Sequence, residues 1–349
     1  MPNCIPNINI NYTIANSLGL PNPIGGVSLP LLSHHVNQSY CTKYGGTQLF
    51  DIILPENNGV PCPLVIYIHG GGFLGNSKNS AYSSSNKKTA IAYLLSRGIA
   101  FASINYYKLN TTNETDGIIK SLSDCVTATQ HFRNYNNQYR IDPNKIGLVG
   151  SSAGAGASLW IGFHPDMKDL NSNDLIMQQT TRVNAIAALN TQATYDLRKW
   201  HSAVFNSGLQ EINVYNILGS SKLKSYCLVP SNITQVVDRR AAITSYLGSS
   251  VDYKGNTGIN IDMLNLMTKN DPPFWVENDR PYWTVNGGMF LNEMNHHPLH
   301  SEALIDKALS YNGQGTLDVI AKIKNGTDNR VSKGYAGKKW YQWMADQLL

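Results

Sequence analysis

The chain has 349 residues, of which 42% are hydrophobic and only 15% charged, and its formal net charge is +5. This length accommodates one large domain or two ordinary ones, and the apolar content is sufficient for a buried core. No apolar run approaches the roughly 18 residues of a membrane-spanning helix, so we expect no membrane span. The late basic residues lack interleaved aromatic residues, which favours a solvated surface over a nucleic-acid interface.

The five cysteines match no metal-binding spacing. The polar but weakly charged composition favours an exported protein, secreted or periplasmic, with a cytoplasmic location as the alternative. The start MPNCIPNINI has neither a basic n-region nor an apolar h-region, so we expect a form without a signal peptide. In an exported protein we expect an early disulfide between Cys41 and either Cys4 or Cys62, with Cys125 in the core.

The first half of the chain predicts strands that alternate with helices. Residues 1–40, rich in Asn, Pro and Gly, predict an extended lead-in to a domain over residues 41–349. TKYGGTQLFDIILP predicts a hairpin around Gly45 and Gly46. CPLVIYIHGGGF and IAFASINYY are apolar runs typical of strands buried on both faces, with a helix between them. Residues 118–133 carry apolar side chains at helical spacing and predict an amphipathic helix.

The second half continues this alternation. KIGLVG predicts a strand that runs into a helix beginning near Ala153, and RVNAIAAL predicts the next strand. Residues 197–270 lack a clear period and are expected to form an insertion or cap, with a short helix at 239–246. PPFWVEN, SEALIDKAL, TLDVIAKI and KKWYQWMADQLL then predict strand, helix, strand and helix. We expect a mostly parallel sheet of about eight strands with helices on both faces.

Two serines lie among small residues where a strand gives way to a helix. The stretch from Gly150 to Gly154 reads GSSAG and fits G-x-S-x-G, the nucleophile elbow, with Ser152 at its apex. The alternative interpretation is packing alone, because a tight turn from strand to helix also needs small residues.

A second glycine-rich turn follows His69 at the end of an earlier strand. A nucleotide site is the natural rival, but G-x-G-x-x-G spacing and a P-loop Lys-Ser/Thr are both missing. Consecutive glycines instead allow backbone N–H groups to converge, and together with the amide of Ala153 they could stabilise an oxyanion. His69 is expected to fix this turn by hydrogen bonds rather than to act as a base.

HGGGF followed by DPNKIGLVGSSAGA resembles the α/β-hydrolase superfamily. It is most similar to HGGG-bearing esterases of the hormone-sensitive-lipase group and to bacterial carbohydrate-esterase-like and feruloyl-esterase-like enzymes. The resemblance implies an α/β-hydrolase fold and hydrolysis of small-molecule carboxylic esters through an acyl-enzyme, without a cofactor. It implies Ser152 as the nucleophile, with an oxyanion hole from Gly71, Gly72 and Ala153.

The resemblance does not extend to the general base that activates the serine. Related enzymes carry this histidine after the last strand, and here no histidine follows His300. The remaining cluster, NEMNHHPLH, contains His296, His297 and His300 ahead of a helix. We expect the base in this cluster, and the resemblance favours His296 over His297. A metal site formed by the three histidines is a weaker alternative, since no carboxylate stands at ligand spacing.

Three carboxylates are candidates for the acid that orients the histidine. In order of preference they are Asp279, directly after the PPFWVEN strand, Glu293, and Asp196.

For the substrate we expect short-chain or aryl esters, since no extended apolar lid helix is visible. Two alternatives remain open, namely an inactive hydrolase-fold binding module and a peptidase on the same fold. Aromatic residues that could line a pocket are Trp200, Trp275, Tyr282 and Trp283.

Overall fold

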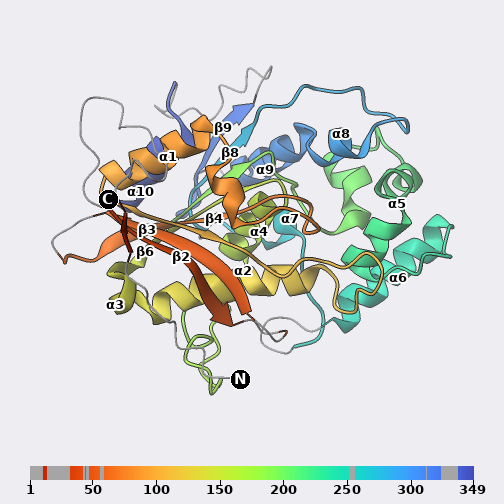
Figure 1. Cartoon of the computed structure of the whole chain (residues 1–349). Coiled ribbons are helices and arrows are strands. Elements are labelled where there is room, and N and C mark those ends of the chain that lie inside the picture. Colours follow the sequence, from red (N-terminus) through yellow and green to blue (C-terminus); the bar gives the residue numbers. More distant parts are fainter. Residues whose placement is uncertain are drawn as a thin grey trace.

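The strands form one twisted sheet that passes through the centre of the molecule (Figure 1). The computed structural model describes residues 11–13, 32–41, 44, 47–55, 59–250, 256–311, 313–323 and 337–349. Within these residues the sheet has nine strands in the order β1-β2-β3-β5-β4-β6-β7-β8-β9. They are β1 (Asn11–Thr13), β2 (Leu32–Cys41), β3 (Thr47–Pro55), β4 (Cys62–Ile68), β5 (Ala100–Ile104), β6 (Ile141–Ser151), β7 (Ala185–Leu189), β8 (Phe274–Asn278) and β9 (Val319–Ile323).

The sheet is mostly parallel, as the sequence predicts. Strands β5, β4, β6, β7, β8 and β9 are parallel to one another, whereas the pairs β1–β2, β2–β3 and β3–β5 are antiparallel. Because the carboxyl ends of parallel strands lie at one edge, the turns after β4, β6, β7 and β8 gather there. These turns carry the glycine-rich HGGG segment, Ser152 and the loop that leads to His296.

Helices cover both faces of the sheet. They are α1 (Ser85–Ser96), α2 (Ile118–Asn134), α3 (Asn136–Tyr139), α4 (Ala153–Phe163), α5 (Glu211–Cys227), α6 (Val236–Ser249), α7 (Met263–Leu266), α8 (Leu291–Asn295), α9 (Leu299–Leu309) and α10 (Trp340–Leu348), with short helical turns η2 (Lys78–Tyr82), η3 (Leu197–Lys199) and η4 (Trp200–Val204). Side chains of a strand alternate between the faces, so Val65 and Tyr67 pack with α1 and α10. Leu64 and Ile66 pack instead with the cluster that contains α2, α4 and α9.

The N-terminal part of the sheet extends further than the sequence predicts. Strand β2 begins at Leu32 and pairs with β3 from Leu32↔Pro55 to Cys41↔Thr47, so residues 32–40 belong to the sheet rather than to a lead-in. The register shifts between His35 and Gln38, where Asn37 has a positive φ of 51°. This bulge interrupts the alternation of the polar segment LSHHVNQSY and hides the strand in the sequence. Gly45 and Gly46, the expected turn of the hairpin, lie outside the described residues.

The expected insertion between β7 and β8 is largely helical. Residues 197–270 contain η3, η4, α5, α6 and α7, and the short helix expected at 239–246 is the centre of α6. Figure 1 shows α5 and α6 side by side at one end of the molecule, close to α8. Helix α5 escapes sequence prediction because it is kinked at Gly219, whose φ of 76° and ψ of 157° break the helical period.

The early disulfide expected between Cys41 and Cys62 is not formed. Cys62 is a free, buried thiol in β4 that donates to the carbonyl of Arg140, and burial raises its pKa to about 11. Cys4 and the side chain of Cys41 lie outside the described residues. Cys125 lies free in the core, as expected, and Cys227 is also free and buried.

None of the described helices has both the length and the apolar composition needed to cross a membrane.

Candidate active site

Ser152 occupies a strained turn between β6 and α4. Its φ of 53° and ψ of −120° are rarely adopted by a residue with a side chain. Its amide donates to the carbonyl of Leu189 at 2.9 Å, which fixes the turn against the end of β7. A Cβ on Gly150 would lie 2.1 Å from the Gly154 carbonyl oxygen, and one on Gly154 would lie 2.0 Å from the Ile68 carbonyl oxygen. Both glycines are therefore required for this close approach of strand and helix.

The structure brings His296 to Ser152. The distance between Nε2 of His296 and Oγ of Ser152 is 2.8 Å, which is hydrogen-bond length. His296 directly follows α8, and two amide side chains hold this segment over the carboxyl edge of the sheet. Asn278, at the end of β8, donates to the carbonyl of His296 at 3.1 Å, and Gln192 donates to the carbonyl of Asn295 at 2.7 Å.

The other imidazole nitrogen of His296 contacts Asn292, one turn earlier on α8. Nδ1 lies 2.8 Å from Oδ1 of Asn292 and 3.1 Å from its backbone carbonyl oxygen. A carbonyl oxygen can only accept, so the proton resides on Nδ1. The lone pair of Nε2 is thereby directed at the Ser152 hydroxyl.

None of the three carboxylates expected at this position hydrogen bonds to His296 in the described structure. Asp279 is exposed, and its carboxylate lies 3.5 Å from Nε of Arg280. Glu293 accepts from the amide of Phe290 at the start of α8. Asp196 forms an ion pair with Arg198 at 2.7 Å. Asn292 is not among the residues that the sequence predicts here, although its spacing of four residues from His296 on a helix is a recognisable signal.

The surroundings of His296 favour its neutral form. Burial lowers the pKa of His296, a hydrogen bond to Asn292 opposes this shift, and the positive charges of Arg280 and Lys222 lower the pKa further. The negative charge of Asp279 raises it, as the weakest of these effects. A neutral imidazole at physiological pH is the form that can accept a proton.

The neighbouring histidines have different partners. His297 Nε2 lies 2.9 Å from the carbonyl oxygen of Trp283, and its Nδ1 accepts from the amide of Leu299. His300 is fully buried, with Nδ1 accepting from Ala193 and Nε2 3.1 Å from the carbonyl oxygen of Met294. Both rings are therefore engaged by the backbone. The described residues contain no cluster of three or more His, Cys, Asp or Glu side chains that could hold a metal ion.

The glycine-rich turn after β4 faces the same point. Gly71 and Gly72 have φ values of 105° and 62°, and a Cβ on Gly71 would lie 2.5 Å from the carbonyl oxygen of Gly75. Within the described residues, the backbone amides of Gly71, Gly72 and Ala153 donate to no protein acceptor. Unpaired amides beside a serine hydroxyl form a potential binding site for a negatively charged oxygen.

Aromatic side chains hold the turn in place. The ring of Tyr106 stacks on His69 with centroids 4.2 Å apart, and its hydroxyl donates to the carbonyls of His69 and Gly70 at 2.9 and 3.3 Å. Tyr226, from α5, donates to the carbonyl of Gly72 at 2.9 Å. Burial lowers the pKa of His69 to about 4, and its Nδ1 lies 2.7 Å from the carbonyl oxygen of Gly70. His69 thus stabilises the turn through these contacts.

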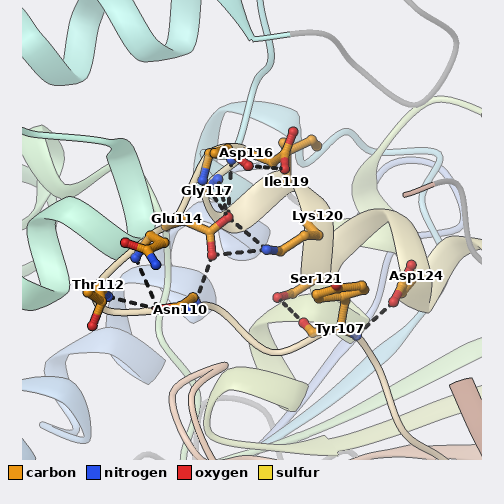
Figure 2. A network of polar contacts seen from close by, with 12 residues as sticks. Tyr107, Asn110, Thr112, Glu114, Asp116, Gly117, Ile119, Lys120, Ser121 and Asp124 are labelled. Atoms are coloured by element: carbon orange, nitrogen blue, oxygen red, sulfur yellow. Dashed lines mark hydrogen bonds and ion pairs between the residues drawn. The ribbon is translucent and has the colours of Figure 1, made fainter. Parts of the chain in front are cut away.

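The loop that carries Tyr106 is itself fixed by a network of charged groups between β5 and α2 (Figure 2). The carboxylate of Glu114 accepts from Lys120 at 2.8 Å and from the amides of Asn110, Thr115, Asp116 and Gly117. Asp124, on α2, accepts from the amide of Tyr107 at 2.7 Å. The amide of Leu109 donates to the carbonyl of Phe73, so this network connects directly to the glycine-rich turn.

Two cavities meet at Ser152. The larger, of about 310 Å³, is lined by Gly71, Gly72, His296, Asn190 and Arg280 among others. The smaller, of about 20 Å³, is bounded by Gly72, Tyr195, Trp200, Lys222, Tyr226 and Asn295. Of the four aromatic residues singled out in the sequence, only Trp200 borders these cavities. Trp275 packs against Trp343 on the other face of the sheet.

Comparison with known proteins gives one family model and many solved structures of one fold. The model of the BD-FAE family matches residues 50–277, more than half of the chain. This match includes Ser152 and the glycine-rich turn but ends before Asn292 and His296. No curated protein sequence matches the chain significantly.

Solved structures resemble the whole chain. An acetyl ester-xyloside bifunctional hydrolase from Caldicellulosiruptor lactoaceticus shares 15% identity over 97% of this chain and 94% of its own, with a TM-score of 0.52. A bacterial heroin esterase shares 16% identity over 96% and 89% with a TM-score of 0.52. A truncated carbohydrate esterase from gut microbiota shares 18% over 85% and 91% with a TM-score of 0.51. At such identities the likeness establishes a common α/β-hydrolase fold.

Proposed function

Because this chain belongs to the BD-FAE family, of the α/β-hydrolase type, we propose that it is a serine carboxylic-ester hydrolase. The observation that carries the proposal is the 2.8 Å contact between Ser152 Oγ and His296 Nε2. A serine hydroxyl is a weak nucleophile unless a base accepts its proton, and this geometry supplies one.

In the proposed reaction, Ser152 Oγ attacks the ester carbonyl carbon while His296 Nε2 accepts the hydroxyl proton. The carbonyl oxygen becomes an oxyanion, which the amides of Gly71, Gly72 and Ala153 stabilise. His296 then donates its proton to the departing alcohol oxygen, leaving an acyl-enzyme. Water, deprotonated by His296, hydrolyses this intermediate and restores the Ser152 hydroxyl.

Asn292 takes the third place of the triad in this proposal. The usual acid fixes the histidine tautomer and stabilises the imidazolium that forms during attack. Asn292 performs the first task through its two oxygens, at 2.8 and 3.1 Å from Nδ1. It carries no charge, so it contributes less to the second task. Asp279 remains a more distant contributor through its negative charge.

The cavities support a short acyl group. The smaller cavity, of about 20 Å³, has space for one or two water-sized groups, which suits an acetyl group better than a long chain. The larger cavity, of about 310 Å³, would take the alcohol, including an aryl alcohol. We propose that residues 197–270 act as a cap, because α5 contributes Leu218, Lys222 and Tyr226 to the smaller cavity.

Stopped-flow hydrolysis of p-nitrophenyl acetate tests the function. We expect a burst of one p-nitrophenol per chain, and Ser152→Ala should abolish both burst and turnover. Mass spectrometry after treatment with an organophosphonate should find the label on Ser152. No hydrolysis of any short ester together with an unlabelled Ser152 would contradict the proposal. Activity that rises steadily with acyl length beyond about ten carbons would contradict the short-chain preference.

We also propose that the protein acts outside the cytoplasm, which its low content of charged residues supports. With Cys62, Cys125 and Cys227 free, Cys4 and Cys41 are the remaining pair. A disulfide between them is expected in protein made under oxidising conditions. Peptide mass spectrometry that finds all five thiols free would count against the proposed location.

A further inference from the structure

Lys222, on α5, places a positive charge beside the proposed oxyanion hole. Its Nζ lies 3.8 Å from the position that a Cβ on Gly72 would occupy, and 5.1 Å from the ring centroid of Tyr226. Lys222 and Ser152 line the same small cavity. A group bound there would therefore contact the ammonium and the reacting serine together.

This ammonium has no counter-charge among the described residues. In the part of the chain that the structure describes, Lys222 makes no ion pair and no side-chain hydrogen bond, and burial alone lowers its pKa to about 8. Lys222 is partly exposed, whereas two buried lysines have carboxylate partners. Lys78 lies 2.8 Å from Asp51, and Lys120 lies 2.8 Å from Glu114.

A partly buried cation without a counter-charge is unfavourable in a folded protein, and the ring face of Tyr226 offsets only part of this cost. A titratable group with a shifted pKa in a cleft is a candidate for a functional role, and for a cation the matching ligand group is an anion. The neighbours of Lys222 in the cavity, among them Gln192, Tyr195, Trp200 and Asn295, are uncharged and bring no carboxylate.

We propose that Lys222 binds a carboxylate carried by the substrate, so that the preferred esters are short and anionic. This proposal rests on the proposed ester hydrolysis and adds the charge of its substrate. The carboxylate belongs either to the acyl part, as in a half-ester of a short dicarboxylic acid, or to the alcohol part, as in an O-acetylated hydroxy acid. The first would place its acyl part against Lys222 in the smaller cavity, and the second its alcohol part, with the acetyl group then in the larger cavity.

Matched pairs of esters that differ only in charge test the proposal. For the acyl part, monoethyl succinate is compared with ethyl succinamate, and for the alcohol part, acetoxyacetate with acetoxyacetamide. A pH-stat at pH 7 follows acid release by wild type, Lys222→Met and Lys224→Met. Lys224 is the control, because it lies on the same helix but lines neither cavity at Ser152 and donates to the carbonyl of Thr112.

Wild type and Lys224→Met should prefer the anionic member of at least one pair by about 10- to 100-fold in kcat/KM, the range of a charged hydrogen bond. The pair that shows the preference identifies the part of the substrate that carries the carboxylate. Lys222→Met should lose the preference, because its kcat/KM should fall more toward the anionic member of the pair than toward the neutral member. Equal rates for both members of each pair in wild type would overturn the proposal. An equal loss of activity toward anionic and neutral esters in Lys222→Met would also overturn the proposal. Lys222 would then stabilise the oxyanion, which both kinds of ester form.

Binding measurements separate this proposal from the proposed function. In a Ser152→Ala background no acyl transfer is needed, and calorimetry compares the affinities for the same four esters. Tighter binding of an anionic ester that disappears in Ser152→Ala/Lys222→Met supports the carboxylate site even if turnover is absent. Equal affinities in both variants overturn it even if the wild type hydrolyses neutral esters.

Discussion

Asn292 holds the imidazole of His296 from one helical turn away, with Oδ1 2.8 Å from Nδ1. A neutral amide thus stands where hydrolases of this type usually carry a carboxylate. Burial and two nearby cations already lower the pKa of His296, and Asn292 adds no negative charge to raise it. The proposed base should therefore stay neutral, and active, below the ordinary histidine pKa of about 6.5.

Replacement of Asn292 by Asp should raise the pKa of His296, because a carboxylate within hydrogen-bond reach stabilises the imidazolium. Only the neutral imidazole accepts the Ser152 proton, so kcat/KM falls as pH decreases through this pKa. The acid limb of the kcat/KM profile should move upward by about one pH unit or more in Asn292→Asp. Profiles measured between pH 4 and 9 would show the shift.

Two further variants complete this test. Asn292→Ala should lower kcat by about 10- to 100-fold, less than the roughly 10⁴-fold known for a lost triad acid, because the backbone carbonyl still fixes the tautomer. Glu293→Gln is the control, since that carboxylate accepts from the Phe290 amide instead. An unchanged acid limb in Asn292→Asp would mean that Asn292 does not position the base.

Tyr106→Phe should impair the oxyanion hole without removing any of its donors. The variant keeps the ring that stacks on His69 but leaves the carbonyls of His69 and Gly70 without this hydroxyl. A buried acceptor left unpaired costs about 1–3 kcal/mol, which denaturant unfolding would detect. We expect kcat to fall about tenfold while KM changes little, since the turn would lose its alignment in the transition state. A change confined to KM would contradict this role.

Gly154→Ala should prevent folding, because its methyl group would lie 2.0 Å from the Ile68 carbonyl oxygen. The matched control is Gly248→Ala on α6, where a Cβ would meet no atom within 4 Å. That substitution should stabilise the protein by about 0.5–1 kcal/mol through the higher helix propensity of alanine. Soluble yield and thermal unfolding of the two variants compare these effects. A well-folded Gly154→Ala would refute the close approach of strand and helix.

Asp124 should make the protein less stable as pH rises. Burial raises the pKa of Asp124 from 3.8 to about 7, hydrogen bonding to the Tyr107 amide and the charge of Lys120 oppose this, and its Oδ1 has no described partner. The folded state thus keeps a proton that the unfolded state loses. Between about pH 4 and 7 this group should lower the unfolding free energy by up to about 1.4 kcal/mol per pH unit. Urea unfolding should show that the unfolding free energy of Asp124→Asn declines less steeply between about pH 4 and 7 than that of wild type.

The motifs of this chain predict the fold because each demands a particular backbone. G-x-S-x-G needs a strand that turns sharply into a helix, and the structure has this turn with Ser152 at a φ of 53°. The continuous apolar run of β4 requires burial on both faces, and every residue of that strand is buried. Strand β2 and helix α5 were hidden because a bulge and a kink at Gly219 interrupt the periods that identify them.

Asn292 and Lys222 lie beyond sequence prediction for a different reason. Asn292 orients the base only because α8 lies over the end of β8, where Asn278 binds the carbonyl of His296. Lys222 is notable only because its neighbours bring no carboxylate, which depends on how α5 packs beside the glycine-rich turn. Neither property belongs to a local pattern, since both arise from segments distant in the chain.

The placement of His296 ahead of α9 separates the proposed chemistry from the last strand. In this arrangement β9 and α10 complete the sheet and its covering layer but carry neither the base nor its anchor. Substitutions after α9 can then accumulate as long as the sheet edge stays covered, while the short stretch from Asn292 to His296 tolerates almost none. Relatives that share this placement of the base should accordingly diverge more after α9 than between Asn292 and His296.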